Sequence, residues 1–180
     1  MKTLILAHPY DKSFCHEIFN IIKNHNPELQ VIDLYRDGFN PTTSKEELSQ
    51  YNSGTVMDEL VIKYQKLLKQ TTDLIIVTPI WWNSIPAILK GFFDKVLSKH
   101  FAYEDSSMGV NGNLKNIKKA QIITTSNSPV TYLKINGVNH VLKMTLKQVG
   151  VSRIKFTQLG SIKKTTLNDR KHFLNKLINE

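Results

Sequence analysis

The sequence predicts an α/β fold in which helices cover both faces of a five-stranded parallel sheet, forming a three-layer sandwich. Short apolar runs alternate with amphipathic segments along the 180 residues, and parallel strands need such helical crossovers to return to the same edge of a sheet. The chain shows no internal repeat, low-complexity tract or interrupting linker, and its length suits one core. We therefore expect a single domain over residues 1–180.

The predicted strands are short runs rich in apolar and β-branched residues. In chain order they cover residues 2–7, 29–34, 74–78, 120–125 and 153–159. Helices are expected where apolar residues recur with helical spacing. These segments cover residues 13–26, 44–50, 56–70, 84–97, 136–149 and 168–178.

A few residues mark the expected element boundaries. Ser13 and Ser84 are suitable N-caps, and Pro86 is tolerated in the first turn of a helix. Residues 101–116 contain two glycines and show little periodicity. A long surface loop is therefore expected there.

Composition excludes several classes of protein. The chain lacks a run of about 18 apolar residues, so no membrane-spanning segment is expected, and it lacks the pattern of a signal peptide. Its single cysteine, Cys15, allows no internal disulfide, which fits the reducing cytoplasm. We expect a cytoplasmic protein, and no metal site is predicted.

The charge distribution points to an anionic partner. The formal net charge is +9, and residues 106–168 contain lysines and an arginine but neither Asp nor Glu. A positive field of this kind attracts both phosphorylated cofactors and nucleic acid. The chain lacks a nucleic-acid recognition motif of the usual kinds, so no nucleic-acid partner is predicted.

Polar residues gather at the start of the first predicted helix. His8, Lys12 and His16 lie close to Ser13, and a helix N-terminus that begins at a hydroxyl residue attracts phosphate through its free N–H groups and its dipole. The alternative is a simple N-cap in a surface turn. The segment has neither the Walker pattern nor the glycine-rich dinucleotide fingerprint.

Two further strand ends carry unusual residues. Trp81 and Trp82 follow the third strand, and a polar cluster at residues 124–128 follows the fourth. Ligands of open α/β sheets bind in the crevice at the carboxyl ends of the strands. The tryptophans suit a flat ligand there, although packing in the core or against a second subunit explains them as well. The polar cluster alone is explained by a turn.

Several blocks of the sequence resemble one family. They are Leu4-Ile-Leu-Ala-His8-Pro9 with Ser13-Phe14, then Asp33-Leu34-Tyr35, Phe39-Asn40-Pro41, Phe101-Ala102-Tyr103 and Thr124-Thr125, and above all Pro79-Ile80-Trp81-Trp82 followed by Ile85-Pro86-Ala87-Ile88-Leu89-Lys90-Gly91-Phe92-Phe93-Asp94-Lys95-Val96. In this order the chain resembles the flavodoxin-like NAD(P)H:quinone oxidoreductases. That family includes the mammalian quinone reductases and the bacterial ancillary reductases of potassium efflux systems.

The resemblance implies a flavodoxin-like sheet with strand order 2-1-3-4-5, a bound FMN or FAD, and a homodimer. By position, the residues at the flavin phosphate and ribityl chain are His8, Ser13, Phe14 and Cys15. Those along the isoalloxazine are Pro79, Ile80, Trp81, Trp82 and Asn83, and those at its other edge are Thr124, Thr125, Ser126 and Asn127. FMN is favoured because the chain is shorter at its C-terminus than the animal FAD enzymes. The lysine-rich second half favours NADPH over NADH.

The chain departs from the family pattern near the catalytic position. The animal enzymes use a tyrosine and a histidine as hydrogen-bond partners of the flavin. Tyr132 matches the tyrosine, but Asn139 falls where the histidine is expected and His140 follows it. Tyr132 and His140 are therefore the catalytic candidates, although neighbours on a helix point about 100° apart, and a solvated histidine explains His140 as well. Cys15 is interpreted as a packing residue or a backbone contact.

The resemblance implies a flavin-dependent oxidoreductase that passes a hydride from NADH or NADPH through the flavin to quinones or similar flat electrophiles. A regulatory role is the alternative. In that case the protein is a flavin-containing subunit that docks on another protein, such as a potassium efflux system, and associates peripherally with the membrane.

Overall fold

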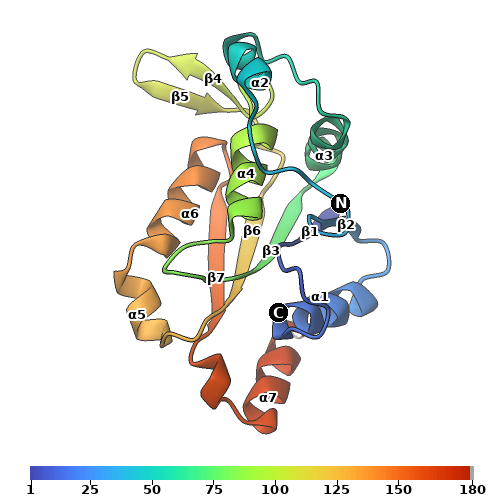
Figure 1. Ribbon diagram of the computed structural model, residues 1–180, viewed down its shortest axis with the longest axis vertical. Coiled ribbons are helices and arrows are strands. Elements are labelled where there is room, and N and C mark those ends of the chain that lie inside the picture. The colour runs from blue at the N-terminus through green and yellow to red at the C-terminus, as the bar shows by residue number, and fades with distance from the viewer. Residues whose placement is uncertain (179–180) are drawn as a thin grey trace.

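Residues 1–178 are described by a computed structural model in which a five-stranded parallel sheet lies between two layers of helices (Figure 1). The strands are β1 (Lys2–Leu6), β2 (Gln30–Asp33), β3 (Asp73–Pro79), β6 (Lys119–Thr125) and β7 (Arg153–Leu159). Their order in the sheet is β2-β1-β3-β6-β7, which confirms the predicted order 2-1-3-4-5. Residues 179–180 of the predicted domain lie outside the described part of the chain.

The helices of the described chain agree with most predicted segments. They are α1 (Phe14–His25), α2 (Lys45–Ser49), α3 (Glu59–Gln70), α4 (Ala87–Val96), α5 (Val130–Ile135), α6 (Val138–Gln148) and α7 (Leu167–Ile178), with short 3-10 helices η1 (Tyr51–Ser53) and η2 (Ile162–Lys164). Ser13 caps α1 as expected, because its side chain accepts a hydrogen bond from the backbone N–H of His16.

The core is divided by the sheet into two layers. Leu4 and Leu6 point to the face covered by α1 and α7, whereas Ile5 points to the face covered by α3, α4 and α6. This follows from the alternation of side chains along a strand. Burial on both faces explains why the strand sequences are continuous apolar runs.

The start of α4 differs from the prediction. Ser84 is not its N-cap, because the Ser84 backbone is tied to Trp81 in a tight turn, and the helix begins at Ala87 with Pro86 in the capping position. The expected N-cap was therefore wrong. A prediction from residue type alone misses this because the hydrogen bonds of the turn compete for the same backbone groups.

Two further segments differ from the expected pattern. Residues 101–116, expected as a loop, contain an antiparallel hairpin of β4 (Tyr103–Ser106) and β5 (Gly109–Gly112). The predicted helix over residues 136–149 begins at Val138, and a separate helix, α5, precedes it. Gly137 lies between them with a φ of 85°, a left-handed conformation that few other residues adopt.

A buried lysine holds the connection after β2 against α4. Lys95 Nζ lies 2.8 Å from Asp58 Oδ2 and 3.0 Å from Glu47 Oε1, and it donates to the backbone oxygen of Asn40 at 3.1 Å. The lysine side chain is only 5% exposed. Burial opposes its charge, but the two carboxylates outweigh that effect and raise the pKa of Lys95 above its ordinary value.

Two negative findings apply to residues 1–178 only. No helix in this range combines the length and hydropathy that crossing a bilayer requires. The same residues contain no group of three or more His, Cys, Asp or Glu side chains arranged to hold a metal ion.

Candidate functional site

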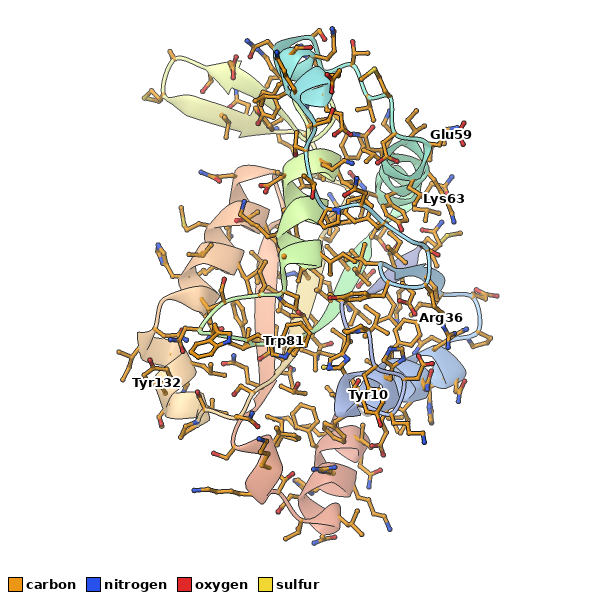
Figure 2. The ribbon with its side chains drawn as sticks, viewed as in Figure 1. Tyr10, Arg36, Glu59, Lys63, Trp81 and Tyr132 are labelled. Carbon is orange, nitrogen blue, oxygen red and sulfur yellow. The ribbon has the colours of Figure 1, made fainter. Side chains whose placement is uncertain are left out.

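The site residues predicted from sequence gather at the carboxyl ends of β1, β3 and β6. β1 pairs with β2 on one side and with β3 on the other, so the chain reverses its direction across the sheet at this point. Such a reversal leaves the following loops apart and opens a crevice. Figure 2 shows Tyr10, Trp81 and Tyr132 at the same end of the sheet, on the loop after β1, the loop after β3 and α5.

The N-terminus of α1 forms one end of this site. The backbone N–H groups of Phe14 and Cys15 have no carbonyl partner within the helix, because they belong to its first turn. The guanidinium of Arg170, on α7, stacks over the Phe14 ring at 5.5 Å from its centroid. The sequence analysis missed Arg170. The sequence marks Arg170 only as a basic residue in a predicted helix, and the packing of that helix against α1 is seen only in the structure.

His8 connects this end of the site to the aromatic loop. Its Nδ1 accepts a hydrogen bond from the Tyr10 backbone N–H at 3.1 Å, and His16 Nε2 lies 3.0 Å from the His8 backbone oxygen. The pKa of His8 is lowered first by burial and then by the neighbouring His16. The His8 ring therefore favours its neutral form near pH 7.

The loop after β3 separates the two tryptophans. Trp81 and Ser84 exchange both backbone hydrogen bonds at 2.9 Å, which leaves Trp82 and Asn83 at the tip of a two-residue turn. Their φ angles are 48° and 65°, as in a type I′ turn, and this conformation is strained for a tryptophan. Trp82 is 99% exposed.

Trp81 instead lies within the site. It is 41% exposed, and its ring meets that of His8 edge to face with centroids 5.6 Å apart. Pro79 and Ile80 are buried, and the Ile80 backbone N–H donates to the Thr125 carbonyl oxygen at 2.8 Å. The loops after β3 and β6 are thereby joined.

Cys15 belongs to the packing between α1 and β6. Its Sγ lies 3.2 Å from Thr125 Oγ1, and the side chain is almost fully buried. Burial raises the pKa of Cys15 to about 12, although the hydrogen bond with Thr125 opposes the shift. A thiol of this kind is neutral and unreactive, which agrees with the interpretation of Cys15 as a packing residue.

The polar cluster after β6 is closed by its own hydrogen bonds. Ser126 is buried, and its Oγ donates to the Ser128 carbonyl oxygen at 2.6 Å, while its backbone N–H donates to Leu159 O. Gly160 lies so close that an added Cβ would stand 2.6 Å from Ser128 O. Asn127 is exposed. The loop is therefore held in one shape from both sides.

Thr124 takes part in a network that the sequence analysis did not find. Gln158 Nε2 donates to Thr124 Oγ1 at 3.0 Å and to Asn139 Oδ1 at 3.1 Å, and Asn139 Nδ2 donates to Gln158 Oε1 at 3.0 Å. Asn139, and not the exposed His140, is the α6 residue that bonds to the sheet. Gln158 lies beside Thr124 in the register of β6 and β7. In the sequence, this network was indicated only by a glutamine near the end of a predicted strand.

The two catalytic candidates lie on the two helices that connect β6 to β7. Tyr132 is 44% exposed on α5, and His140 is exposed on α6. Asn136, between these helices, has a buried Nδ2 without a hydrogen-bond partner among residues 1–178. A buried donor of this kind costs stability unless a ligand or water satisfies it.

A cavity of about 340 Å³ lies at the other end of the strands, where Lys2, Asp73 and Lys119 line it. Two of its basic residues are already engaged, because Lys119 Nζ lies 2.8 Å from Asp73 and Lys2 Nζ donates to Asn26. The helix N-terminus and the aromatic wall are at the opposite end of the sheet. The carboxyl-end crevice is therefore the stronger candidate for the functional site.

Comparisons with known proteins agree with this architecture. An uncharacterized NAD(P)H oxidoreductase of Haemophilus influenzae is 36% identical over 169 residues, which cover 88% of this chain and 83% of that protein. An FMN-dependent NADH:quinone oxidoreductase of Coprothermobacter proteolyticus is 33% identical over 117 residues, covering 62% of this chain and 58% of that protein. The match therefore spans little more than half of the second relative.

Solved structures and family models extend the similarity to nearly the whole chain. The crystal structure of Smu.1420 from Streptococcus mutans superposes with a TM-score of 0.87 and 34% identity, covering 99% of this chain and 97% of that one. Residues 1–178 match the model of Flavodoxin_2, a family with a flavodoxin-like fold. With this match and the sheet order β2-β1-β3-β6-β7, the chain belongs to the Flavodoxin_2 family.

Proposed function

We propose that this protein is a flavin-dependent NAD(P)H oxidoreductase that transfers electrons to quinones or similar flat electrophiles. The observation that carries the proposal is that a helix N-terminus, an aromatic residue and a polar strand end gather at the carboxyl edge of the sheet, where its strand order reverses. Relatives named as an NAD(P)H oxidoreductase and as an NADH:quinone oxidoreductase support it.

The residues present fit a flavin nucleotide. The N–H groups of Phe14 and Cys15, with Arg170 nearby, suit the phosphate, since a helix N-terminus and a cation both favour an anion. Trp81 offers a wall for the ring. We assign the remaining predicted contacts to the same crevice. They are His8, Ser13, Pro79, Ile80, Asn83, Thr124, Thr125, Ser126 and Asn127, whereas Trp82 lies in solvent at the tip of its turn.

Bound flavin supplies the two-electron chemistry, and the protein orients the reactants and tunes the charge at the ring. Trp81 limits access of water to the ring. Tyr132 holds a proton at the ring edge, and His140 is the second, outer candidate for this task.

We propose FMN as the flavin, because the second of the relatives above is described as FMN-dependent. The nicotinamide donor is proposed to be NADPH, since residues 106–168 carry lysines and no carboxylate side chain. Heat release of the chromophore followed by mass spectrometry identifies the flavin. Equal kcat/KM values for NADH and NADPH would contradict the choice of donor.

We also propose a homodimer. A groove of about 680 Å³ runs between α4, α6 and the β4–β5 hairpin, and apolar or aromatic side chains line much of it. Leu48, Tyr51 and Val141 expose apolar surface there. An exposed apolar surface of this kind marks an interaction site. None of the three proteins compared above is described as a regulatory subunit, so the alternative of docking on an efflux system gains no support.

The decisive experiment measures flavin binding by the purified protein. The apoprotein is mixed with FMN or with FAD, and the absorbance and fluorescence of the flavin are followed together with NAD(P)H oxidation in the presence of a quinone. We expect tight binding of FMN and quinone-dependent turnover. A protein that acquires neither flavin, while remaining folded by circular dichroism, would contradict the proposal. Arg170→Met should weaken FMN binding, whereas Lys171→Met, an exposed neighbour on α7, serves as its control.

A further inference from the structure

The cavity at the amino ends of the strands is separate from the proposed flavin site. Its lining comes from α1, α7 and the strands β1, β3, β6 and β7, and its volume is about 340 Å³. Small-molecule sites commonly measure about 300–1,000 Å³, so this cavity suits a small ligand. Aliphatic side chains of both helices and of the sheet, among them Ile22, Leu177 and Ile75, contribute to the lining. An apolar group is therefore favoured inside the cavity.

A row of charged side chains crosses the sheet at this cavity. Lys2 on β1 pairs in register with Asp73 on β3. Asp73 pairs in turn with Lys119 on β6, and Lys119 pairs with Arg153 on β7. Neighbours in register point to the same face of a sheet. Leu4, two residues after Lys2, packs in the core layer of α1 and α7, so the row points to the face that these helices cover.

Two positive charges of this row have no carboxylate partner among residues 1–178. Lys119 Nζ lies 2.8 Å from Asp73 Oδ1, so these two charges offset each other. Lys2 Nζ donates at 3.2 Å to the amide oxygen of Asn26, which is neutral. The Arg153 side chain makes neither a hydrogen bond nor an ion pair with the described part of the chain. The cavity therefore carries an excess of positive charge beside its apolar lining.

The two uncompensated cations lie far apart. β1 and β7 are separated by three strand spacings of about 4.8 Å each, or about 14 Å, and Lys2 is held toward the end of α1 by its bond to Asn26. One anionic head group therefore contacts Arg153 without also contacting Lys2. The guanidinium is a planar fork that donates two parallel hydrogen bonds to a carboxylate. Lys2 adds attraction at longer range.

We propose that this cavity binds a small amphipathic carboxylate, such as the anion of a medium-chain fatty acid. The carboxylate lies at the exposed rim against Arg153, and the aliphatic chain lies between α1 and α7. Burial of the chain removes apolar surface of both ligand and protein from water. The site does not depend on flavin, because it lies at the opposite end of the sheet from the helix N-terminus and Trp81.

The first test compares three probes by isothermal titration calorimetry of the purified protein. Saturating FMN is present, so that the proposed flavin site is not available to the probes. Octanoate carries both the head group and the chain, acetate carries only the head group, and octanol carries only the chain. We expect octanoate to bind at least about 10-fold more tightly than either of the others. Octanoate that binds no more tightly than acetate or octanol would overturn the inference.

Substitution of Arg153 tests the place of the head group. Arg153→Gln should weaken octanoate binding about 10-fold, because a charge-assisted pair is lost. Arg153→Lys keeps the charge without the fork, so its affinity should lie between those of the wild type and Arg153→Gln. The control is Lys143→Gln, which removes a positive charge from an exposed position of α6 on the other face of the sheet. It should leave octanoate affinity within about twofold. Wild-type affinity in Arg153→Gln would overturn the inference.

The histidines report where octanoate binds. His25 lines the cavity from α1, whereas His172 lies on α7 outside it. Octanoate should shift the NMR signals of the His25 ring and leave those of His172 unchanged. A shift of His172 with no change at His25 would place the ligand elsewhere and overturn the inference.

A lipid surface is the other possible source of an acyl chain beside an anionic group. Sedimentation with vesicles of anionic phospholipid tests this source. Protein that sediments with the vesicles but does not bind free octanoate would overturn the inference. The outcome is also distinct from that of the proposed function. Protein that binds FMN but not octanoate would overturn this inference alone, and protein that binds octanoate but neither flavin would contradict the proposed function alone.

Discussion

The rings of His8 and Trp81 meet edge to face with centroids 5.6 Å apart, joining the loop after β1 to the loop after β3. Burial lowers the pKa of His8, and the nearby His16 lowers it further. Removing the indole should admit water, so Trp81→Ala is expected to raise the pKa of His8 toward its ordinary value of about 6.5. Titration of the His8 ring signals by NMR measures the shift.

The same lowered pKa predicts a pH dependence of stability. A histidine whose folded-state pKa is depressed contributes stability that is complete above about pH 6.5 and is lost as the pH falls through its folded-state value. His8→Asn should therefore flatten the loss of unfolding free energy below pH 6.5. Denaturant titrations between pH 5 and 8, about the range in which histidine titrates, test this. A variant as sensitive as the wild type would contradict it.

The two tryptophans should respond differently to replacement by alanine. Trp81→Ala is expected to weaken FMN binding about 10-fold, since an aromatic wall contributes more than 1 kcal/mol. Trp82 is 99% exposed, so Trp82→Ala should leave FMN affinity within about twofold. Fluorescence titration with FMN compares them. Equal and negligible effects would return both residues to a packing role.

Loss of Lys95 should cost far more stability than loss of Lys90. Lys95→Met leaves Asp58 and Glu47 without their cation, and we expect a loss of about 2 kcal/mol in unfolding free energy, less than for a fully buried pair because both carboxylates are partly hydrated. Lys90→Met breaks the exposed pair with Asp94 and should cost at most about 0.5 kcal/mol.

The contribution of Lys95 should also depend on pH. Burial raises the pKa of Asp58, but its hydrogen bond and charge interaction with Lys95 outweigh burial and lower it overall. Stability from this depressed carboxyl is present above about pH 3.9, its unfolded value, and is lost as the pH falls through the folded value. The difference between wild type and Lys95→Met should therefore shrink in acid.

If two subunits meet at the groove beside α6, a charged side chain placed in the groove should separate them. Val141 lines the groove and is 59% exposed. If two copies meet there, Val141→Glu should shift the protein to monomers because it buries a charge. Lys143→Glu introduces the same side chain at an exposed site of the same helix. Light scattering coupled to size-exclusion chromatography should find a dimer for that control. A monomeric wild-type protein would contradict the proposed dimer.

The sheet was predictable because its strands are buried on both faces. Residues 120–125 and 153–159 agree with the observed strands to within one residue. The β4–β5 hairpin was not predictable, because its residues are largely exposed and lack apolar alternation. The N-terminus of α4 was missed for a different reason, since the Trp81–Ser84 turn uses the backbone groups that a Ser84 cap requires.

The site was predictable by segment and less so by side chain. His8, Ser13 and Trp81 gather as expected because strand ends of a parallel sheet share one edge. Gln158 and Arg170 were missed because their partners lie far away in the sequence. A single polar residue in a strand or helix does not reveal which neighbour it meets.

The two-residue turn between Trp81 and Ser84 also gives the protein two separate optical probes. These are the chain's only tryptophans, and the turn sends them into different surroundings. Trp81, beside His8, is expected to report binding at the proposed flavin site through quenching of its emission. Trp82, at the tip, emits from solvent and reports contacts made by the outer surface. Replacing either one by phenylalanine isolates the signal of the other.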